Sequence, residues 1–227
     1  MAILPPLLDL LFPPKCVFCG RLLEAPGSPV CPTCARDLPA VEPDKPLLRA
    51  GGFDCAAAFY YEDMVKTAVH ALKFQNRPGR AAVLGRYIAQ AAAERLPGRF
   101  DAVTFVPVSP VRRFQRGYDQ SQLLARAAAE AWGLQPLSLL RKVRHTRPQS
   151  TLRAPEERRA NALGAYAPVR PAAGAGRRLL LVDDVCTTGS TLSACAETLL
   201  AAGAADVVCA VLAVARTQVG SAPGGGI

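Results

Sequence analysis

The stretch from residue 179 to residue 191 constrains the fold of this chain more than any other. Four apolar residues, Leu179–Val182, have the character of a strand that is buried on both faces of a parallel sheet. This run stops at two adjacent carboxylates, Asp183 and Asp184. A loop rich in hydroxyl groups, residues 187–191, follows and contains a glycine that permits a tight turn. The order is therefore strand, acidic pair and hydroxyl loop.

A helical pattern comes directly after this loop. Apolar residues recur with helical spacing from residue 192 to residue 200, and Ser190 or Thr191 can cap the helix. Backbone N–H groups at a helix start, with Ser and Thr hydroxyls nearby, form a site for a phosphate. Carboxylates cannot favourably face that phosphate, so sugar hydroxyls or a hydrated Mg²⁺ are the natural partners of the acids. The alternative is an ordinary strand-to-helix turn in which Asp and Thr side chains serve only as caps.

The same order of residues resembles the signature of type I phosphoribosyltransferases that binds 5-phosphoribosyl 1-diphosphate (PRPP). In that signature an apolar strand, two acids and a short spacer precede the pattern Thr-Thr-Gly-x-Thr, which here occupies residues 187–191. The resemblance implies one loop that holds both the 5-phosphate and the ring hydroxyls of the sugar.

Two CxxC units lie near the N-terminus. Cys16, Cys19, Cys31 and Cys34 form the pattern C-x2-C-x11-C-x2-C. Four soft ligands suit tetrahedral Zn²⁺, and a complete four-cysteine set leaves no open coordination position, so we predict a structural zinc site. A redox dithiol pair and unpaired thiols are the alternatives. A segment with so little apolar content needs the metal in order to fold.

Strand patterns and helix patterns alternate along the rest of the chain. This alternation predicts an α/β fold with a mostly parallel sheet flanked by helices, whose ligands collect at the carboxyl ends of the strands. The further strands are expected at residues 53–61, 101–106, 137–143 and 206–215, and the further helices at 63–74, 79–96 and 120–132.

The chain divides into three parts in this interpretation. Residues 1–46 form a zinc-ribbon domain that ends in a linker at 39–46, residues 51–216 form the α/β domain, and residues 217–227 form a Gly- and Ser-rich disordered tail. The apolar N-terminus lacks a basic region and contains prolines, so we expect no export signal. No apolar run is long enough to span a membrane, and we expect no membrane insertion, a cytoplasmic location and thiols rather than disulfides.

Two basic segments separate the cysteines from the acidic pair. The formal net charge of +9 favours anionic partners. Arginine side chains offer forked donors to phosphate oxygens, although such runs are usually solvated faces. The candidate arginines are Arg112, Arg113 and Arg116 in the first segment, and Arg144, Arg147, Arg153 and Arg158 in the second.

Four segments together are similar to the ComF family of bacterial phosphoribosyltransferase-like proteins with an N-terminal zinc ribbon. They are the N-terminal cysteine region, residues 116–125, residues 147–161 and the loop at 183–191. This resemblance covers nearly the whole chain. It implies a type I phosphoribosyltransferase-like fold for the α/β domain, with the zinc ribbon in the place where salvage enzymes carry a hood that reads a base.

The resemblance also implies roles for individual residues. Asp183 and Asp184 bind the ribose hydroxyls, and Val108 and Ser109 occupy the place of the pyrophosphate loop. The basic loop from Arg144 to Arg158 closes over the site, and Mg²⁺ neutralises the leaving group. The residues that hold the 5-phosphate are Thr187, Thr188, Gly189, Ser190 and Thr191.

Three functions follow as hypotheses. The first is a PRPP-binding protein that acts in DNA uptake, natural transformation or nucleotide metabolism, with single-stranded DNA and a competence helicase as partners. The second is a nucleobase salvage phosphoribosyltransferase. The third is a non-catalytic zinc protein that binds single-stranded DNA on the same fold.

Overall fold

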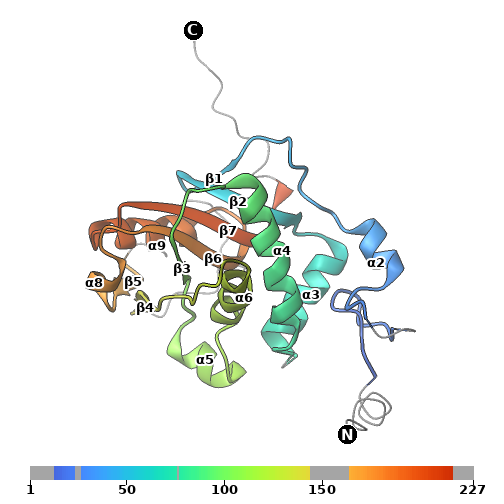
Figure 1. Ribbon diagram of the computed structural model, residues 1–227. Helices are drawn as coiled ribbons and strands as arrows, with labels where there is room; N and C mark the ends of the chain where they lie inside the picture. The colour runs from blue at the N-terminus through green and yellow to red at the C-terminus, as the bar shows by residue number, and fades with distance from the viewer. Residues whose placement is uncertain (1–12, 24–26, 76, 144–163, 217–227) are drawn as a thin grey trace, which may run out of the picture.

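A five-stranded sheet forms the centre of the protein (Figure 1). The computed structural model describes residues 13–23, 27–75, 77–143 and 164–216. The strand order is β1-β2-β7-β6-β3, in which β1 pairs antiparallel with β2 and all other neighbours are parallel. The predicted mostly parallel sheet is therefore confirmed. The strands are β1 (Leu48–Ala50), β2 (Phe53–Tyr60), β3 (Ala102–Phe105), β6 (Arg178–Cys186) and β7 (Asp206–Val214).

Helices cover both faces of this sheet, so the strand β6 is buried on both sides. Leu180 and Val182 join the apolar cluster beneath α4 (Arg80–Arg95) and α6 (Gln120–Ala129). Leu179 and Leu181 join the second cluster, which includes the buried face of α9 (Ser190–Ala201). Side chains that alternate between two cores explain why this strand is an uninterrupted apolar run.

Strand β6 extends further than its apolar run. Pairing with β7 continues through Asp183 and Val185 to Cys186, so the two acids lie within the strand and not in the loop after it. Helix α9 begins at Ser190, and its N-cap is Gly189, which has no side chain to cap the helix; the N–H of Ser190 donates to Thr188 Oγ1 at 3.5 Å. The expected cap by Ser190 or Thr191 is therefore wrong. The turn requires a left-handed residue at the cap, and glycine supplies it.

The remaining helices connect the strands. The helix expected at 120–132 is α6 followed by a short 3-10 turn, Glu130–Trp132. The helix expected at 63–74 is α3 (Asp63–Phe74). Three short helices were not expected: α2 (Pro32–Asp37), α5 (Pro110–Arg116) and α8 (Pro171–Gly174). Pro110 in the first turn of α5 and the left-handed Gly117 at its end are ordinary helix limits.

Two expected segments differ from their predictions. Residues 137–143 supply the short strand β4 (Leu140–Lys142), which pairs antiparallel with β5 (Tyr166–Pro168) outside the main sheet. Only Leu137 reaches the main sheet, through a single parallel bridge to Thr104 of β3. Residues 39–46 do not form a free linker, because Val41 N–H donates to Ala58 O at 3.0 Å. The chain after the cysteines therefore lies along the edge of β2.

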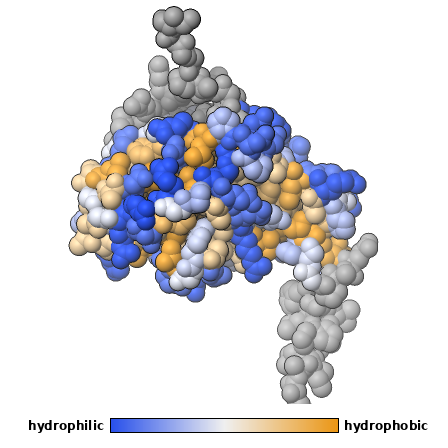
Figure 2. Space-filling view, turned by 45° about the horizontal axis from the view of Figure 1, so that its top comes forward, coloured by the Kyte–Doolittle hydropathy of each residue, from blue (hydrophilic) through white to orange (hydrophobic). Residues whose placement is uncertain are grey.

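The surface is mixed in character. The face shown in Figure 2 alternates hydrophilic and hydrophobic side chains. Within the described ranges, no helix has both the length and the apolarity to cross a membrane. The tail at 217–227 lies outside the described residues.

Candidate functional site

The acidic pair lies near the carboxyl end of β6 and is buried, with exposed fractions of 8% for Asp183 and 4% for Asp184. Asp183 is held in place by two donors to the same oxygen. Ser121 Oγ donates to Asp183 Oδ1 at 2.9 Å, and the N–H of Asp184 donates to it at 2.8 Å. The start of α6 therefore fixes the orientation of this carboxyl.

Asp184 is held from two different helices. The ammonium of Lys73, in the last turn of α3, lies 2.8 Å from Asp184 Oδ1. Gln120 Nε2 donates to Asp184 Oδ2 at 3.1 Å. Sequence reasoning assigned no role to Lys73, Gln120 or Ser121. The signals for the last two were their place in the segment 116–125, which carries part of the family resemblance, and a polar pair at the start of a helix.

The charges of this cluster influence one another. Burial, followed by the neighbouring charge of Asp184, raises the pKa of Asp183 to about 7. Burial is the largest single influence on Lys73 and works against its charged form, but the charge and hydrogen bond of Asp184, together with the charge of Asp183, outweigh it, and the pKa of Lys73 is raised. Near neutral pH Asp183 can therefore release its proton. The carboxyl then changes from a hydrogen-bond donor to an acceptor.

The hydroxyl loop follows the acids and leads into α9. Thr188 Oγ1 and Ser190 Oγ lie 2.9 Å apart, and Ser190 and Thr191 stand in the first turn of the helix. Gly189 has a φ of 76°, and a Cβ at this position would lie 2.4 Å from the backbone nitrogen of Gly51. The loop is thus pressed against the end of β1, and backbone N–H groups of α9 are presented next to the acids.

Val108 and Ser109 lie between β3 and α5, at the same edge of the sheet. The N–H of Val108 donates to Asp119 Oδ2 at 2.9 Å, and Ser109 Oγ accepts the N–H of Arg112 at 3.3 Å as the cap of α5. Because β3 and β6 are parallel neighbours, their carboxyl ends place this loop beside the acidic pair.

Helix α5 carries the first group of arginines. Arg116 Nη1 donates to Gln120 Oε1 at 2.7 Å, and its guanidinium lies 5.0 Å from the centroid of the Phe74 ring. Since Gln120 also donates to Asp184, Arg116 is connected to the acidic pair through this side chain. Of the other two arginines, Arg113 is exposed to solvent and Arg112 is half-buried. The second group, Arg144, Arg147, Arg153 and Arg158, lies outside the described residues.

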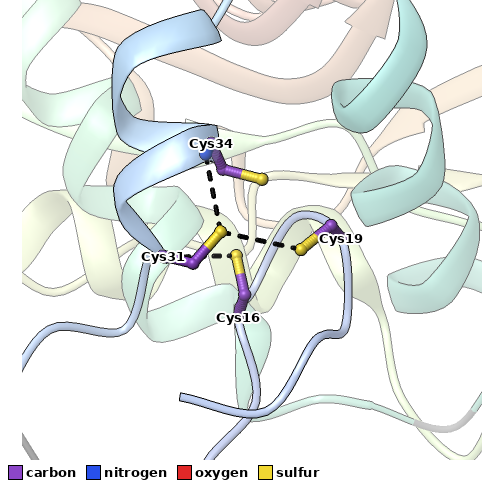
Figure 3. Close-up of side chains that lie close together, drawn as sticks. All are labelled: Cys16, Cys19, Cys31 and Cys34. Atoms are coloured by element: carbon purple, nitrogen blue, oxygen red, sulfur yellow. Dashed lines mark hydrogen bonds between the residues drawn. The ribbon is translucent and has the colours of Figure 1, made fainter. Parts of the chain in front are cut away.

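The four N-terminal cysteines converge, as Figure 3 shows. Their Sγ atoms all lie within 4.8 Å of one another, and those of Cys19 and Cys31 are 3.8 Å apart. Four thiolates at about 2.3 Å from a tetrahedral zinc ion lie about 3.8 Å from one another, so this set fits zinc. Backbone N–H groups add to the fit, since the N–H of Cys31 donates to Cys16 Sγ at 3.4 Å.

The other four cysteines are buried free thiols. Cys186 lies in β6 immediately before the hydroxyl loop, and burial raises its pKa to about 12. Burial also raises the pKa of Cys55, Cys195 and Cys209. The last three are thiols of the apolar core.

Comparison with known proteins assigns the family. A family model described as "Phosphoribosyl transferase domain" matches residues 82–221, and one described as "Double zinc ribbon domain" matches residues 7–45. The chain belongs to the phosphoribosyltransferase family. The N-terminal cysteines are accordingly those of a zinc ribbon, and their geometry supports a structural zinc ion.

Several similar proteins align with most of the chain, including the zinc ribbon and the phosphoribosyltransferase domain. DNA utilization protein YhgH of Salmonella typhimurium is 34% identical over 207 residues, which are 85% of this chain and 86% of that protein. Competence protein F of Haemophilus influenzae is 30% identical, with 86% and 82% covered. Competence protein ComFC of Streptococcus pneumoniae is 28% identical, with 85% and 84% covered. The resemblance to the ComF family is therefore confirmed.

One solved structure aligns with part of the chain. It is titled "Structure of the allosteric regulatory enzyme of purine biosynthesis" and aligns with a TM-score of 0.41 and 21% identity. The alignment covers 63% of this chain and 29% of that one.

Proposed function

We propose that this ComF-family protein binds PRPP with Mg²⁺ at the carboxyl end of β6 and acts in DNA uptake or processing. One observation carries the proposal. Two buried acids stand directly beside a glycine turn, two hydroxyl groups 2.9 Å apart and the N-terminus of a twelve-residue helix. A sugar 5-phosphate fits the helix start, and vicinal ribose hydroxyls fit the carboxylates.

Each group of the site has a task in this proposal. Asp183 and Asp184 accept hydrogen bonds from the ribose hydroxyls, while Ser121 and Gln120 hold the two carboxyls in position. The N–H groups at the start of α9 bind the 5-phosphate. Carboxylate oxygens near a diphosphate suit Mg²⁺, which supplies charge neutralisation of the pyrophosphate when it is bound.

Calorimetric titration of PRPP in the presence of Mg²⁺ tests the ligand. Wild type should bind, and the double variant Asp183→Asn/Asp184→Asn should lose most of the affinity, because neutral amides accept the sugar hydroxyls less strongly. Asp101→Asn is a matched control, since this exposed acid pairs with Arg178 at the opposite end of the sheet. Absence of heat with wild type, or equal affinity in the double variant, would contradict the proposal.

Helix α5 supports the DNA part of the proposal, together with the names of the relatives. None of its residues is buried, and Phe114 is 91% exposed between Arg113 and Arg116. An exposed ring beside guanidinium groups suits a stacked base and its phosphates in single-stranded DNA.

Fluorescence anisotropy with a labelled single-stranded oligonucleotide tests this surface. Phe114→Ala should weaken binding by about 1–3 kcal/mol if a base stacks there. Arg113→Gln should reduce the steepness of the salt dependence, because one fewer phosphate contact is made. Arg36→Gln is the control, as this exposed arginine lies in α2. Unchanged affinity in both α5 variants would show that single-stranded DNA does not bind at α5.

A further inference from the structure

Lys73 occupies an unusual position among the charged residues of the protein. Its side chain is 23% exposed and that of Asp184 only 6%, so this is the most buried ion pair among the described residues. The other ion pairs in these ranges join side chains that are each at least 22% exposed. An ion pair with a half-buried ammonium and a buried carboxylate costs desolvation free energy that a surface pair does not.

The pair leaves hydrogen-bonding capacity on both partners. A carboxylate has roughly four lone-pair positions, and Asp184 uses one oxygen for Lys73 and the other for Gln120. An ammonium has three donors, of which the ion pair with Asp184 needs one. A ligand can therefore contact Asp184 and Lys73 at the same time, without breaking the pair.

A second cation lies near this pair, since the guanidinium of Arg116 lies 5.0 Å from the ring of Phe74, the residue after Lys73. Arg116 is linked to Asp184 through Gln120, with distances of 2.7 Å and 3.1 Å along the two hydrogen bonds. The residue before Gln120, Asp119, accepts the N–H of Val108 at 2.9 Å, so the loop at the end of β3 belongs to the same group of contacts. An anion that enters beside Asp184, near the ends of α3 and α5, is therefore close to two positive charges.

The structure assigns to Lys73 a direct role in ligand binding: its ammonium bridges Asp184 and the diphosphate group of PRPP. This inference rests on the proposed function, because it concerns the same site. Lys73 thereby takes part of the charge neutralisation that a metal ion otherwise supplies, and it distinguishes ligands with a diphosphate at C1 from those without one.

Three ligands separate this role from a purely structural one: PRPP, inorganic pyrophosphate and ribose 5-phosphate. Calorimetric titrations with wild type and Lys73→Met, each with and without Mg²⁺, should show a loss of about tenfold or more for PRPP and pyrophosphate, the worth of one charge-assisted hydrogen bond. Ribose 5-phosphate should change by less than about threefold on the same grounds. Lys66→Met is the control, because this exposed lysine lies in the same helix.

A second variant addresses folding, since Lys73→Met leaves Asp184 without its counter-charge. Asp184→Asn/Lys73→Met removes both charges, and its affinity for PRPP is compared with that of Asp184→Asn alone. A further loss on removal of the lysine supports the bridge. Equal affinities in this pair, or an equal loss for ribose 5-phosphate and PRPP in Lys73→Met, would overturn it. Absence of PRPP binding by the wild type would be a different result, because it would overturn the proposed function as well as the bridge by Lys73.

Discussion

The ring of Phe18 meets the ring of Phe59 edge-on, with centroids 5.7 Å apart and an interplanar angle of 88°. Phe18 lies inside the first CxxC unit and Phe59 lies in β2, and Tyr87 of α4 contacts both rings. Arg80 adds a hydrogen bond to the carbonyl of Val17 at 2.7 Å. The zinc ribbon and the sheet therefore share one core.

Loss of zinc should consequently lower the stability of the whole chain. A strong chelator should shift thermal unfolding to a lower temperature in one transition, because the ribbon loses the metal that organises it while its core contacts reach into the sheet. Differential scanning calorimetry with and without chelator measures this. Two separate transitions, with the larger one unchanged, would show that the parts are independent.

Phe18→Ala tests the same contact without touching the metal ligands. The ring is fully buried, so its removal should cost about 3–5 kcal/mol. Phe114→Ala provides the matched control, since that ring is 91% exposed and its loss should change stability by about 0.5 kcal/mol or less. Denaturant unfolding of the two variants gives the comparison, and similar midpoints would contradict the shared core.

The pKa of Asp183 predicts a dependence of ligand affinity on pH. Folding raises this pKa from the ordinary value of 3.8 to about 7, so the folded protein holds a proton between these values that the unfolded chain has released. The contribution of this group to stability therefore falls as the pH rises from about 4 to about 7 and is level above it. Affinity for PRPP should rise over the upper part of this range, because ribose hydroxyls need an ionised acceptor.

Calorimetry in two buffers with different ionisation enthalpies detects the proton that binding releases near pH 6. Asp183→Asn should abolish both the proton release and the rise in affinity with pH. Proton uptake on binding, or an unchanged pH profile in the variant, would contradict the assignment.

The sequence was informative where contiguous residues carry a function. Apolar strand, acids, hydroxyl groups and helix follow one another in one stretch, and the CxxC spacing brings four thiols together by local turns alone. The limits of β6 were harder to predict, because Asp183 and Asp184 resemble a loop until the buried donors from other elements are known. Those donors are distant in the chain, as Gln120 lies 64 residues before Asp184.

Lys73 shows the same limit more strongly. In the sequence it is an unremarkable basic residue in the last turn of an amphipathic helix, where lysine is favoured by the helix dipole. Only the order of strands in the sheet brings the end of α3 to Asp184. The strand expected at 137–143 is shorter, at 140–142, and lies in a separate two-stranded sheet, since a short apolar pattern does not reveal which sheet it joins.

Ser121→Ala should weaken the site by removing one hydrogen bond. Ser121 is buried and its Oγ donates to Asp183 Oδ1 at 2.9 Å, so we expect a loss of stability of about 1–3 kcal/mol and a further rise in the pKa of Asp183. Ser193→Ala removes a hydroxyl whose two partners, Glu197 and the carbonyl of Gly51, are exposed, and should cost little. Thermal unfolding and the pH profile of PRPP binding measure the two effects, and equal behaviour of both variants would show that Ser121 is not a positioning residue.

Gly189→Ala should remove PRPP binding through the backbone alone. The left-handed conformation costs roughly 1–2 kcal/mol for a residue with a Cβ. Here that Cβ would also lie 2.4 Å from the nitrogen of Gly51, so the loop must move away from β1 and from its place beside the acids. Gly176→Ala separates the two contributions, because Gly176 has a similar φ of 69° but no atom within 4 Å of the added Cβ. Calorimetric titration and thermal unfolding of both variants should show a modest loss of stability in each and a loss of affinity only at position 189. Retained affinity in Gly189→Ala would mean that the contact with Gly51 does not hold the loop in its binding conformation.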